Sequence, residues 1–408
     1  MPSPGTDPVG HDIAIVGGGL VGASLAIALD QAGRDVALVE AAPPGALPEV
    51  FDERNLSFAE ATVHGLRALG VLPLLRAPAG AIRKIHVSRQ GDFGRVVLDA
   101  REHGRERFGQ VVVARDFGEA LEARLAQCTR VTRYRPARFE GTTLAGDRRR
   151  LVLRDADGTQ RDIDARLLVG ADGTRSGVRA ALGIGAAEFD FDQTLFVARV
   201  RTERAPDGTA YERFGDHGPT ALLPRGDGHF GVVHGVPRDE ADAVAALDDR
   251  AWLDRLQAAF GWRVGKFLSS GPRSAYPIVQ VVADALVAPR AALVGNAAQT
   301  LHPIGAQGFN LGLRDALTLA ELIEGADDPG SDALLAEHAR RRADDRAGTL
   351  RFSGGLARLT ASDTDGARPL RSLGFGAVQH LPALRAQLVG GALGYRGDVP
   401  RLCRGDAA

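Results

Sequence analysis

The chain has 408 residues, which is too long for one small core and fits two domains or one large domain with a satellite. Its composition of 44% apolar and 25% charged residues is ordinary for a globular protein, and its formal net charge of −1 argues against the basic surface that a nucleic-acid partner requires. Cys128 and Cys403 are isolated, so neither a disulfide framework nor a metal site is predicted.

The N-terminal region has the pattern of a dinucleotide-binding unit. A short apolar strand from Asp12 to Val16 leads into the loop Gly17–Gly22, and apolar residues then recur at helical spacing until Gly33. A second strand, Val36 to Val39, is closed by Glu40, which stands 18 positions after the last glycine. Strand, GxGxxG, helix, strand and acid together predict dinucleotide binding.

Each part of this pattern has a physical role. Gly17 permits the tight turn, Gly19 lets the backbone approach a pyrophosphate, and Gly22 lets helix and strand pack closely. Glu40 can accept hydrogen bonds from a ribose, and an acid at this position argues against an NADP 2′-phosphate.

Two further glycine-bearing loops follow downstream. An apolar strand at 167–169 breaks into Asp172-Gly173, and a helix is predicted to begin at Gly177. The segment 291–315 reads as a strand, a loop rich in glycine and proline, and a helix. Such a loop presents free backbone N–H groups and the positive end of a helix dipole to a negatively charged group, although an ordinary strand-to-helix turn gives the same pattern.

The three loops, in this order, resemble the three flavin motifs of the class A flavoprotein aromatic hydroxylases. The sequence from Gly295 to Asn310 is especially similar to that of the UbiH-type ubiquinone-biosynthesis hydroxylases. The resemblance covers roughly residues 10 to 350. The chain departs from the wider family at Asn296 and Gln299, as that group also does, and at Gly305-Ala306, where quinone hydroxylases more often have Ala-Gly.

The resemblance implies an α/β fold with a Rossmann-like FAD-binding domain of the para-hydroxybenzoate hydroxylase type, an antiparallel-sheet substrate domain and C-terminal helices. The implied limits are 10–80, 101–182 and 276–330 for the discontinuous FAD-binding domain, 81–100 and 183–275 for the substrate domain, and 331–408 for the C-terminal helical segment.

The resemblance also assigns site residues. The residues implied for FAD binding are Gly17, Gly19, Gly22, Glu40, Arg54, Gln110, Asp172, Gly173, Gly295, Asn296, Gln307, Gly308, Phe309 and Asn310. The residues implied for the loop beside the flavin are His302, Pro303 and Gly305. Arg54 reads equally well as part of a solvated charge cluster, Gln110 as a buried amide that ties a strand end, and His302 as a residue that braces its own loop.

The implied reaction inserts one oxygen of O2 into a polyprenylated methoxyphenol through a flavin C4a-hydroperoxide, with NADH or NADPH as reductant. The cofactor then carries the difficult step, and the protein supplies position, dryness and charge stabilisation. No substrate-side base is assigned. The alternatives left open are a flavin-dependent reductase of prenyl lipids and a non-catalytic quinone or lipid escort on the same fold.

Residue patterns outside the motifs give weaker expectations. A hairpin at 85–98 and strands at 194–200, 220–223 and 229–233 predict an antiparallel sheet. A helix is expected to contain Phe58 and Val63, and an arginine-rich helix from Ala333 to Arg351 is expected to end before Gly354-Gly355.

In the last forty residues, apolar residues recur at intervals and arginines stand beside them. They predict either amphipathic helices packed on the core or a surface that docks on a membrane or on other ubiquinone-pathway enzymes. Neither a signal peptide nor an apolar run long enough for a membrane span is evident, so a cytoplasmic location is expected, with a position peripheral to the inner membrane left open.

Overall fold

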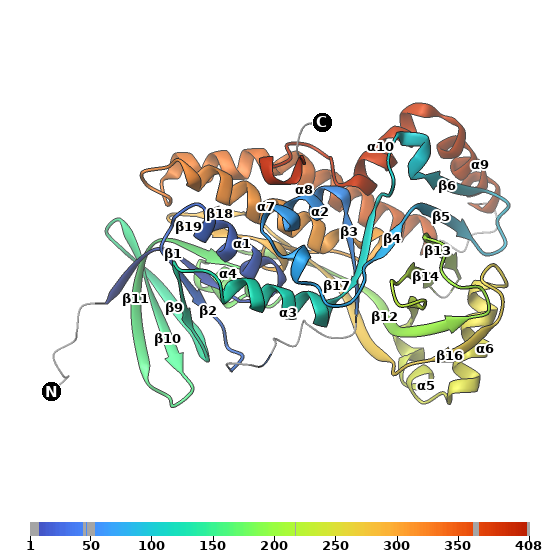
Figure 1. The fold of residues 1–408 in the computed structure, drawn as a ribbon, viewed down its shortest axis with the longest axis horizontal. Helices are drawn as coiled ribbons and strands as arrows, with labels where there is room; N and C mark the ends of the chain where they lie inside the picture. Colours follow the sequence, from blue (N-terminus) through green and yellow to red (C-terminus); the bar gives the residue numbers. More distant parts are fainter. Residues whose placement is uncertain (1–7, 44–45, 47–53, 217, 362–366, 406–408) are drawn as a thin grey trace.

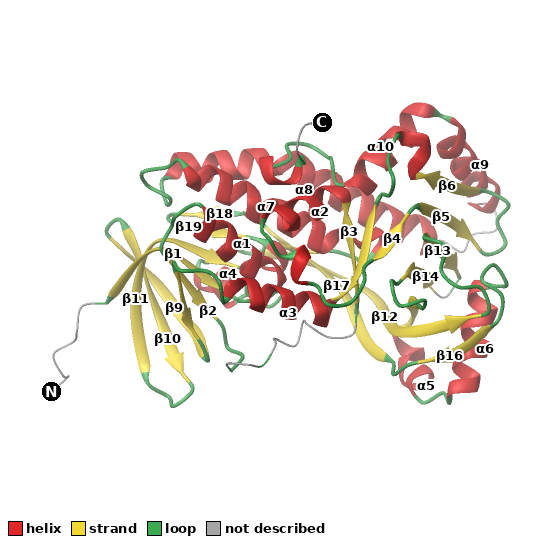
Figure 2. Cartoon of the chain, in the orientation of Figure 1, coloured by secondary structure: helices red, strands yellow, loops and turns green. Residues whose placement is uncertain are grey.

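The computed structural model describes residues 8–43, 46, 54–216, 218–361 and 367–405. Among these residues the strands form three sheets, and Figure 1 shows that the first sheet and the second lie at opposite ends of an elongated molecule. Figure 2 shows helices grouped along one long side, which joins the two ends.

The first sheet is a parallel sheet of the dinucleotide-binding type with an antiparallel extension. Its strand order is β18-β19-β11-β1-β2-β8, and β1 pairs in parallel with both β2 and β11. The strands are β1 (Val9–Val16), β2 (Val36–Val39), β8 (Val131–Tyr134), β9 (Ala137–Ala145), β10 (Arg148–Asp155), β11 (Gln160–Gly170), β18 (Val287–Ala288) and β19 (Ala291–Leu293).

Helices cover one face of this sheet, and strands together with one short helix cover the other. Side chains such as Ile13 and Leu167 pack on the helix face, against α1 (Leu20–Gln31), α3 (Ala114–Leu125) and α7 (Gln307–Glu324). On the opposite face, residues that include Leu151 of β10 and Val178 of α4 (Gly177–Ala181) form a second cluster. Alternate residues of buried parallel strands face opposite layers, so both sets are apolar. The expected Rossmann-like α/β organisation is confirmed.

The second sheet is almost entirely antiparallel, as expected. Its order is β20-β17-β12-β15-β14-β13-β5-β6, β16 pairs with β12, and only β5 and β13 run in parallel. The strands are β5 (Lys84–Arg89), β6 (Arg95–Asp99), β12 (Ala186–Thr202), β13 (Thr209–Gly215), β14 (Gly218–Pro224), β15 (Phe230–Pro237), β16 (Phe267–Ser270), β17 (Ser274–Ala283) and β20 (Gln299–Thr300). Trp252 and Phe260 of α6 (Asp249–Phe260) pack on one face, near α5 (Ala241–Ala245). The predicted hairpin and the three predicted strands are confirmed, whereas the domain limits stay a prediction.

A third, small sheet joins the two ends of the molecule and corrects one expectation. It has the order β3-β7-β4, with β3 (Asn55–Ala59), β4 (Gly80–Ile82) and β7 (Gly109–Val113). Phe58 lies in β3 and not in a helix, because the backbone from Asn55 to Ala59 pairs with β7. The helix α2 (Glu60–Ala68) begins only after this strand.

The described part of the C-terminal segment contains the α-helices α8 (Asp332–Ala361), α9 (Ala367–His380) and α10 (Pro382–Leu393), followed by the short 3-10 helix η6 (Arg401–Cys403). The expected break before Gly354-Gly355 is wrong, because α8 continues through both glycines. A glycine costs about 1 kcal/mol in a helix. Tertiary contacts hold α8 in place before this point: Arg314 and Asp315 of α7 form buried ion pairs with Asp345 and Arg342 of α8, and the Ser353 hydroxyl donates to the His302 carbonyl oxygen at 2.9 Å.

Candidate active site

One cavity brings the three glycine-bearing loops together. Its volume is about 840 Å³, within the range of roughly 300 to 1,000 Å³ for small-molecule sites. Gly17, Asp172 and Asn296, one from each loop, all line it. Segments separated by more than a hundred residues therefore border the same space.

The first loop has no room for a side chain at Gly17. Its φ is +105°, and a Cβ there would lie 2.4 Å from the carbonyl oxygen of Ala171. A Cβ at Gly22 would lie 1.9 Å from the carbonyl oxygen of Gly17. These contacts let α1 start directly against the second loop, with Gly17 and Gly19 bordering the cavity without a side chain.

Glu40 ends β2 beside this loop. Its carboxylate accepts hydrogen bonds from the backbone N–H of Gly18 at 2.8 Å and of Ala42 at 2.8 Å. The carboxylate is thereby held at the cavity wall, where it retains further lone pairs for a hydroxyl donor.

The second loop is shaped by its own carboxylate. Asp172 accepts hydrogen bonds from the Ser176 hydroxyl at 2.5 Å and from the Val178 N–H at 3.0 Å, while Asp172 and Gly173 line the cavity. Asp172 therefore braces the start of α4 as well as bordering the site.

Two side chains fasten the second loop to the third. The hydroxyls of Thr174 and Thr300 are 2.8 Å apart, and buried Arg179 donates to the carbonyl oxygens of Thr174 and Ala297, each at 3.0 Å. The sequence analysis did not identify Arg179, because an arginine inside a short helix carries no signal of its distant partners.

The third loop ends in a left-handed turn at the start of α7. The φ angles of Gly305 and Ala306 are +71° and +51°. Asn310 accepts from the Ala59 N–H and the Thr62 hydroxyl and donates to the carbonyl oxygens of Ser57 and Ala306, at 2.7 to 2.9 Å. These bonds hold the N-terminus of α7 at the cavity, where Gly308 and Phe309 line the wall.

Gln299, one of the positions at which the chain departs from the wider family, is hydrogen-bonded to two side chains. Its amide donates to Asp315 of α7 at 2.6 Å, and its carbonyl oxygen accepts from Arg346 of α8 at 2.9 Å. An amide can donate and accept at once, so Gln299 links an acid to an arginine.

His302 lies inside the third loop and is 1% exposed. Its Nδ1 accepts from the backbone N–H of Ile304 at 3.2 Å, and its ring packs edge-on against Phe191 with centroids 4.6 Å apart. Burial lowers the pKa of His302 to about 4, so the ring is neutral at physiological pH. His302 both braces the loop and lines the cavity.

The predicted site residues fall into two groups. Those that line the cavity are Gly17, Gly19, Glu40, Arg54, Asp172, Gly173, Asn296, His302, Pro303, Gly305, Gly308 and Phe309. Those that do not are Gly22, Gln110, Gly295, Gln307 and Asn310. Gln110 is buried in β7 opposite Phe58, and the Arg54 guanidinium lies 4.6 Å from the centroid of the Tyr276 ring.

A smaller apolar cavity of about 140 Å³ adjoins the large one, and we call it the side arm. Leu98 of β6, Phe108, Phe352 of α8 and Leu388 of α10 line it. The two cavities share wall residues, among them Ile304 and Glu212. Glu212 is a second residue that the sequence analysis did not assign to the site.

Two searches of the described residues set limits on other chemistry. No helix in the described part of the chain is both long and apolar enough to cross a bilayer. The described histidine, cysteine, aspartate and glutamate side chains form no group of three or more that could hold a metal ion.

Comparisons with known proteins agree with this geometry. Residues 11–353 match a family model described as an FAD binding domain. The chain is 35% identical over 402 residues to the ubiquinone hydroxylase UbiL of Rhodospirillum rubrum, covering 97% of this chain and 92% of that protein. It is 30% identical over 398 residues to the 3-demethoxyubiquinol 3-hydroxylase of Escherichia coli, covering 94% and 98%. Its fold matches the crystal structure of the p-nitrophenol 4-monooxygenase PnpA from Pseudomonas putida with a TM-score of 0.75 at 18% identity, covering 96% of this chain and 99% of that one.

Proposed function

The chain belongs to the FAD binding domain family, and from this premise we propose that it is an FAD-dependent aromatic hydroxylase of ubiquinone biosynthesis of the UbiH type. The substrates are a polyprenylated methoxyphenol and O2, and NADH or NADPH is the reductant. The observation that carries the proposal is the single cavity bordered by Gly17, Asp172 and Asn296. The hydroxylase names of the relatives favour this activity over a prenyl-lipid reductase or a non-catalytic escort.

The residues present fit FAD. The Ala171 carbonyl oxygen stands where a Gly17 Cβ would lie, so the tight turn requires glycine, and Gly19 of the same loop lines the cavity without a side chain, as close approach to a pyrophosphate requires. The Glu40 carboxylate is held where a ribose hydroxyl can donate to it. The N-terminus of α7 faces the same cavity, and the first N–H groups of a helix have no partner within it. When bound, FAD supplies the transfer of electrons from NAD(P)H and the activation of O2.

The chain's own residues position the substrate, exclude water from the cavity and stabilise negative charge. The free N–H groups and the dipole of α7, beginning at Gln307, stabilise negative charge beside Pro303 and Gly305. Leu195, Leu223 and other apolar side chains of the second sheet line the facing wall and exclude water. The side arm offers an apolar surface to a prenyl chain.

The test is aerobic turnover of the purified protein with NADH or NADPH and a prenylated methoxyphenol. We expect bound FAD, reductant oxidation that the phenol stimulates, and incorporation of one atom from isotopically labelled O2 into the product. Protein that takes up no FAD would support the escort, and substrate reduction without O2 uptake would support the reductase.

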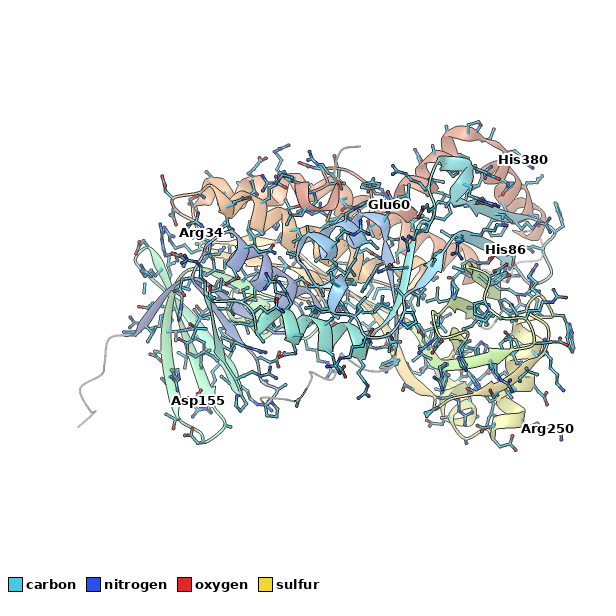
Figure 3. The ribbon with its side chains drawn as sticks, viewed as in Figure 1. Arg34, Glu60, His86, Asp155, Arg250 and His380 are labelled. Atoms are coloured by element: carbon cyan, nitrogen blue, oxygen red, sulfur yellow. The ribbon has the colours of Figure 1, made fainter. Side chains whose placement is uncertain are left out.

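We also propose that the corner formed by α9 and α10 docks on the inner-membrane surface. Leu373 of α9 and Leu381 and Leu384 near the start of α10 are exposed, and Figure 1 shows both helices at one end of the molecule. His380, labelled in Figure 3, lies at the end of α9 and marks this corner of the molecule. Exposed apolar side chains that cluster mark interaction surfaces. Leu388 of the same α10 lines the side arm, so a lipid-borne substrate would have a short path from the bilayer to the cavity.

Flotation with vesicles that contain anionic phospholipid tests this docking. Replacing Leu373, Leu381 and Leu384 with serine is expected to reduce vesicle binding at least tenfold. The matched control is Leu144→Ser, since Leu144 is an exposed leucine on β9 of the first sheet. Deletion of the whole C-terminal segment is a poorer test, because Tyr395 bonds to Glu60 and Cys403 is buried in the core. Equal binding by wild type and the triple variant would contradict the docking.

A further inference from the structure

Glu212 stands on the cavity face of the second sheet. It lies in β13, where it pairs with Val87 of β5 and Ala221 of β14. The ring of its neighbour Tyr211 packs on the other face, against Phe260 and against His86, which Figure 3 labels on this sheet, and Tyr211 also borders the large cavity. Successive side chains of a strand point to opposite faces, so the Glu212 carboxylate points toward the cavities.

The Glu212 carboxylate has no polar partner among the residues that the structure describes. Its side chain makes no hydrogen bond or ion pair with any residue that the structure describes. It keeps a small accessible surface, and that surface borders the large cavity and the side arm. A partly buried carboxylate that faces an apolar cavity loses hydration without gaining a donor from the protein, so a ligand that donates a hydrogen bond to it would offset this cost.

Other charged and titratable groups near Glu212 are already engaged or neutral. Arg396, which lines the side arm, lies over the Phe352 ring at 5.6 Å. Arg54, across the large cavity, lies over Tyr276, and His302 is neutral. Burial alone raises the pKa of Glu212 to about 7. The carboxyl therefore exchanges a proton close to physiological pH, where a general base works best.

We propose that Glu212 is a catalytic residue that accepts a hydrogen bond from the phenol hydroxyl of the substrate and takes its proton. This inference rests on the proposed hydroxylase function. The hydroxyl sits at the junction of the two cavities, the prenyl chain enters the side arm, and the ring faces the loop at Pro303 and Gly305.

The proton transfer balances without a further reactant. The phenolic O–H bond breaks, a new O–H bond forms on Glu212, and the electron pair stays on the phenol oxygen. The resulting phenolate is a more electron-rich ring for oxygen insertion. After insertion, Glu212 returns the proton to the product oxygen and is again a carboxylate.

The experiment compares 2-geranylphenol with its methyl ether, which has no phenolic proton. Binding to the FAD-loaded enzyme is measured by titration calorimetry between pH 5 and pH 9, and turnover is measured over the same range. The variants are Glu212→Gln, Glu212→Asp and Glu188→Gln, the last being an exposed glutamate on β12 of the same sheet. FAD content and melting temperature verify that each variant is folded.

We expect wild type above pH 7 to bind the phenol at least about tenfold more tightly than the ether, as a hydrogen bond to a charged acceptor allows. We expect Glu212→Gln to lose this preference and its kcat/KM to fall by about 10²-fold or more, with loss of the acidic limb near pH 7. Glu212→Asp should recover part of both effects, and Glu188→Gln should match wild type.

The binding and turnover outcomes separate the two proposals. If the Glu212→Gln variant still binds 2-geranylphenol more tightly than its methyl ether, the role of Glu212 is overturned, whether or not product forms. If instead the enzyme binds the phenol more tightly only while Glu212 is present, and yet the wild type forms no hydroxylated product, that result would support Glu212 as the phenol site and reject the hydroxylase function.

Discussion

The hydroxyl oxygens of Thr174 and Thr300 lie 2.8 Å apart and connect two loops that are 126 residues apart in the chain. The bond closes one side of the cavity that Gly17 borders on another. Because the two loops are already held together before a ligand binds, less free energy is spent on ordering them when it does.

Replacing Thr174 with valine should therefore weaken FAD binding. Valine keeps the shape but loses the hydrogen bond, whose net worth is roughly 0.5 to 1.5 kcal/mol, so we expect the Kd for FAD to rise about two- to tenfold. Thr142→Val is the control, because it removes a threonine bond to the Arg150 carbonyl in the β9–β10 hairpin. An equal change in the Kd for FAD in both variants would contradict a role of the Thr174–Thr300 bond in FAD binding.

Replacing Gly17 with alanine should abolish FAD binding. The added Cβ would lie 2.4 Å from the Ala171 carbonyl oxygen, so the first two loops must separate. Gly33→Ala provides the comparison, since Gly33 also has a positive φ of +75° but nothing within 4 Å of its Cβ position. Flavin absorbance per protein should vanish in the first variant and persist in the second, which carries only the backbone strain.

The fingerprint around Gly17 could be predicted because all its parts are local in sequence. One strand, one turn and one helix determine where the glycines and Glu40 stand, and Gly17 and Glu40 both line the large cavity, whereas their contact with FAD stays a prediction. Asn310 lies in a predicted motif, but its four bonds to the protein, among them one to Thr62, became evident only with β3 and α2 in place. A motif therefore predicts location better than it predicts role.

Glu212 could not be assigned from the sequence for the opposite reason. Its surroundings come from β5, β14 and the loop at Ile304, which are distant in the chain. The same limit explains the helix expected at Phe58, which pairing with β7 overrides, and the break expected at Gly354, which packing of α8 on α7 overrides. Tertiary contacts outweigh local preference at Phe58 and Gly354, and they create the surroundings of Glu212.

Replacing His302 with alanine should lower the yield of hydroxylated product per reductant consumed. The loss of the acceptor for the Ile304 N–H leaves a buried donor unpaired and lets the Pro303–Gly308 loop relax, which admits water. Asparagine can accept from the same N–H, so His302→Asn should recover part of the yield. An unchanged yield in His302→Ala would reject any role beside the flavin, and failure of asparagine to recover it would favour a direct ring contact.

Replacing Asp345 with asparagine should strongly destabilise the fold. Asp345 is fully buried and accepts from both Arg314 and Arg342, so the variant leaves two buried guanidinium groups short of one negative charge. Removing one partner of a buried pair costs about 3 to 5 kcal/mol. The exposed pair of Glu337 and Arg340 is the control, and Glu337→Gln should leave the free energy of unfolding nearly unchanged. Urea denaturation measures both, and equal midpoints would contradict the assignment.

Replacing Glu212 with glutamine should stabilise the protein at alkaline pH but not at acidic pH. Burial raises the pKa of Glu212 from 4.5 to about 7, so the folded state binds the proton more tightly than the unfolded state does. The stability that this carboxyl contributes is complete below pH 4.5 and is lost as the pH rises through 7, which amounts to an upper limit of roughly 3 kcal/mol.

Glutamine does not titrate, so the difference in free energy of unfolding between Glu212→Gln and wild type should be near zero at pH 4.5 and should grow toward pH 8. The exposed Glu188→Gln variant should show no such trend. A constant difference across this range would mean that Glu212 keeps an ordinary pKa in the fold, and the proton transfer assigned to it would then lose its physical basis.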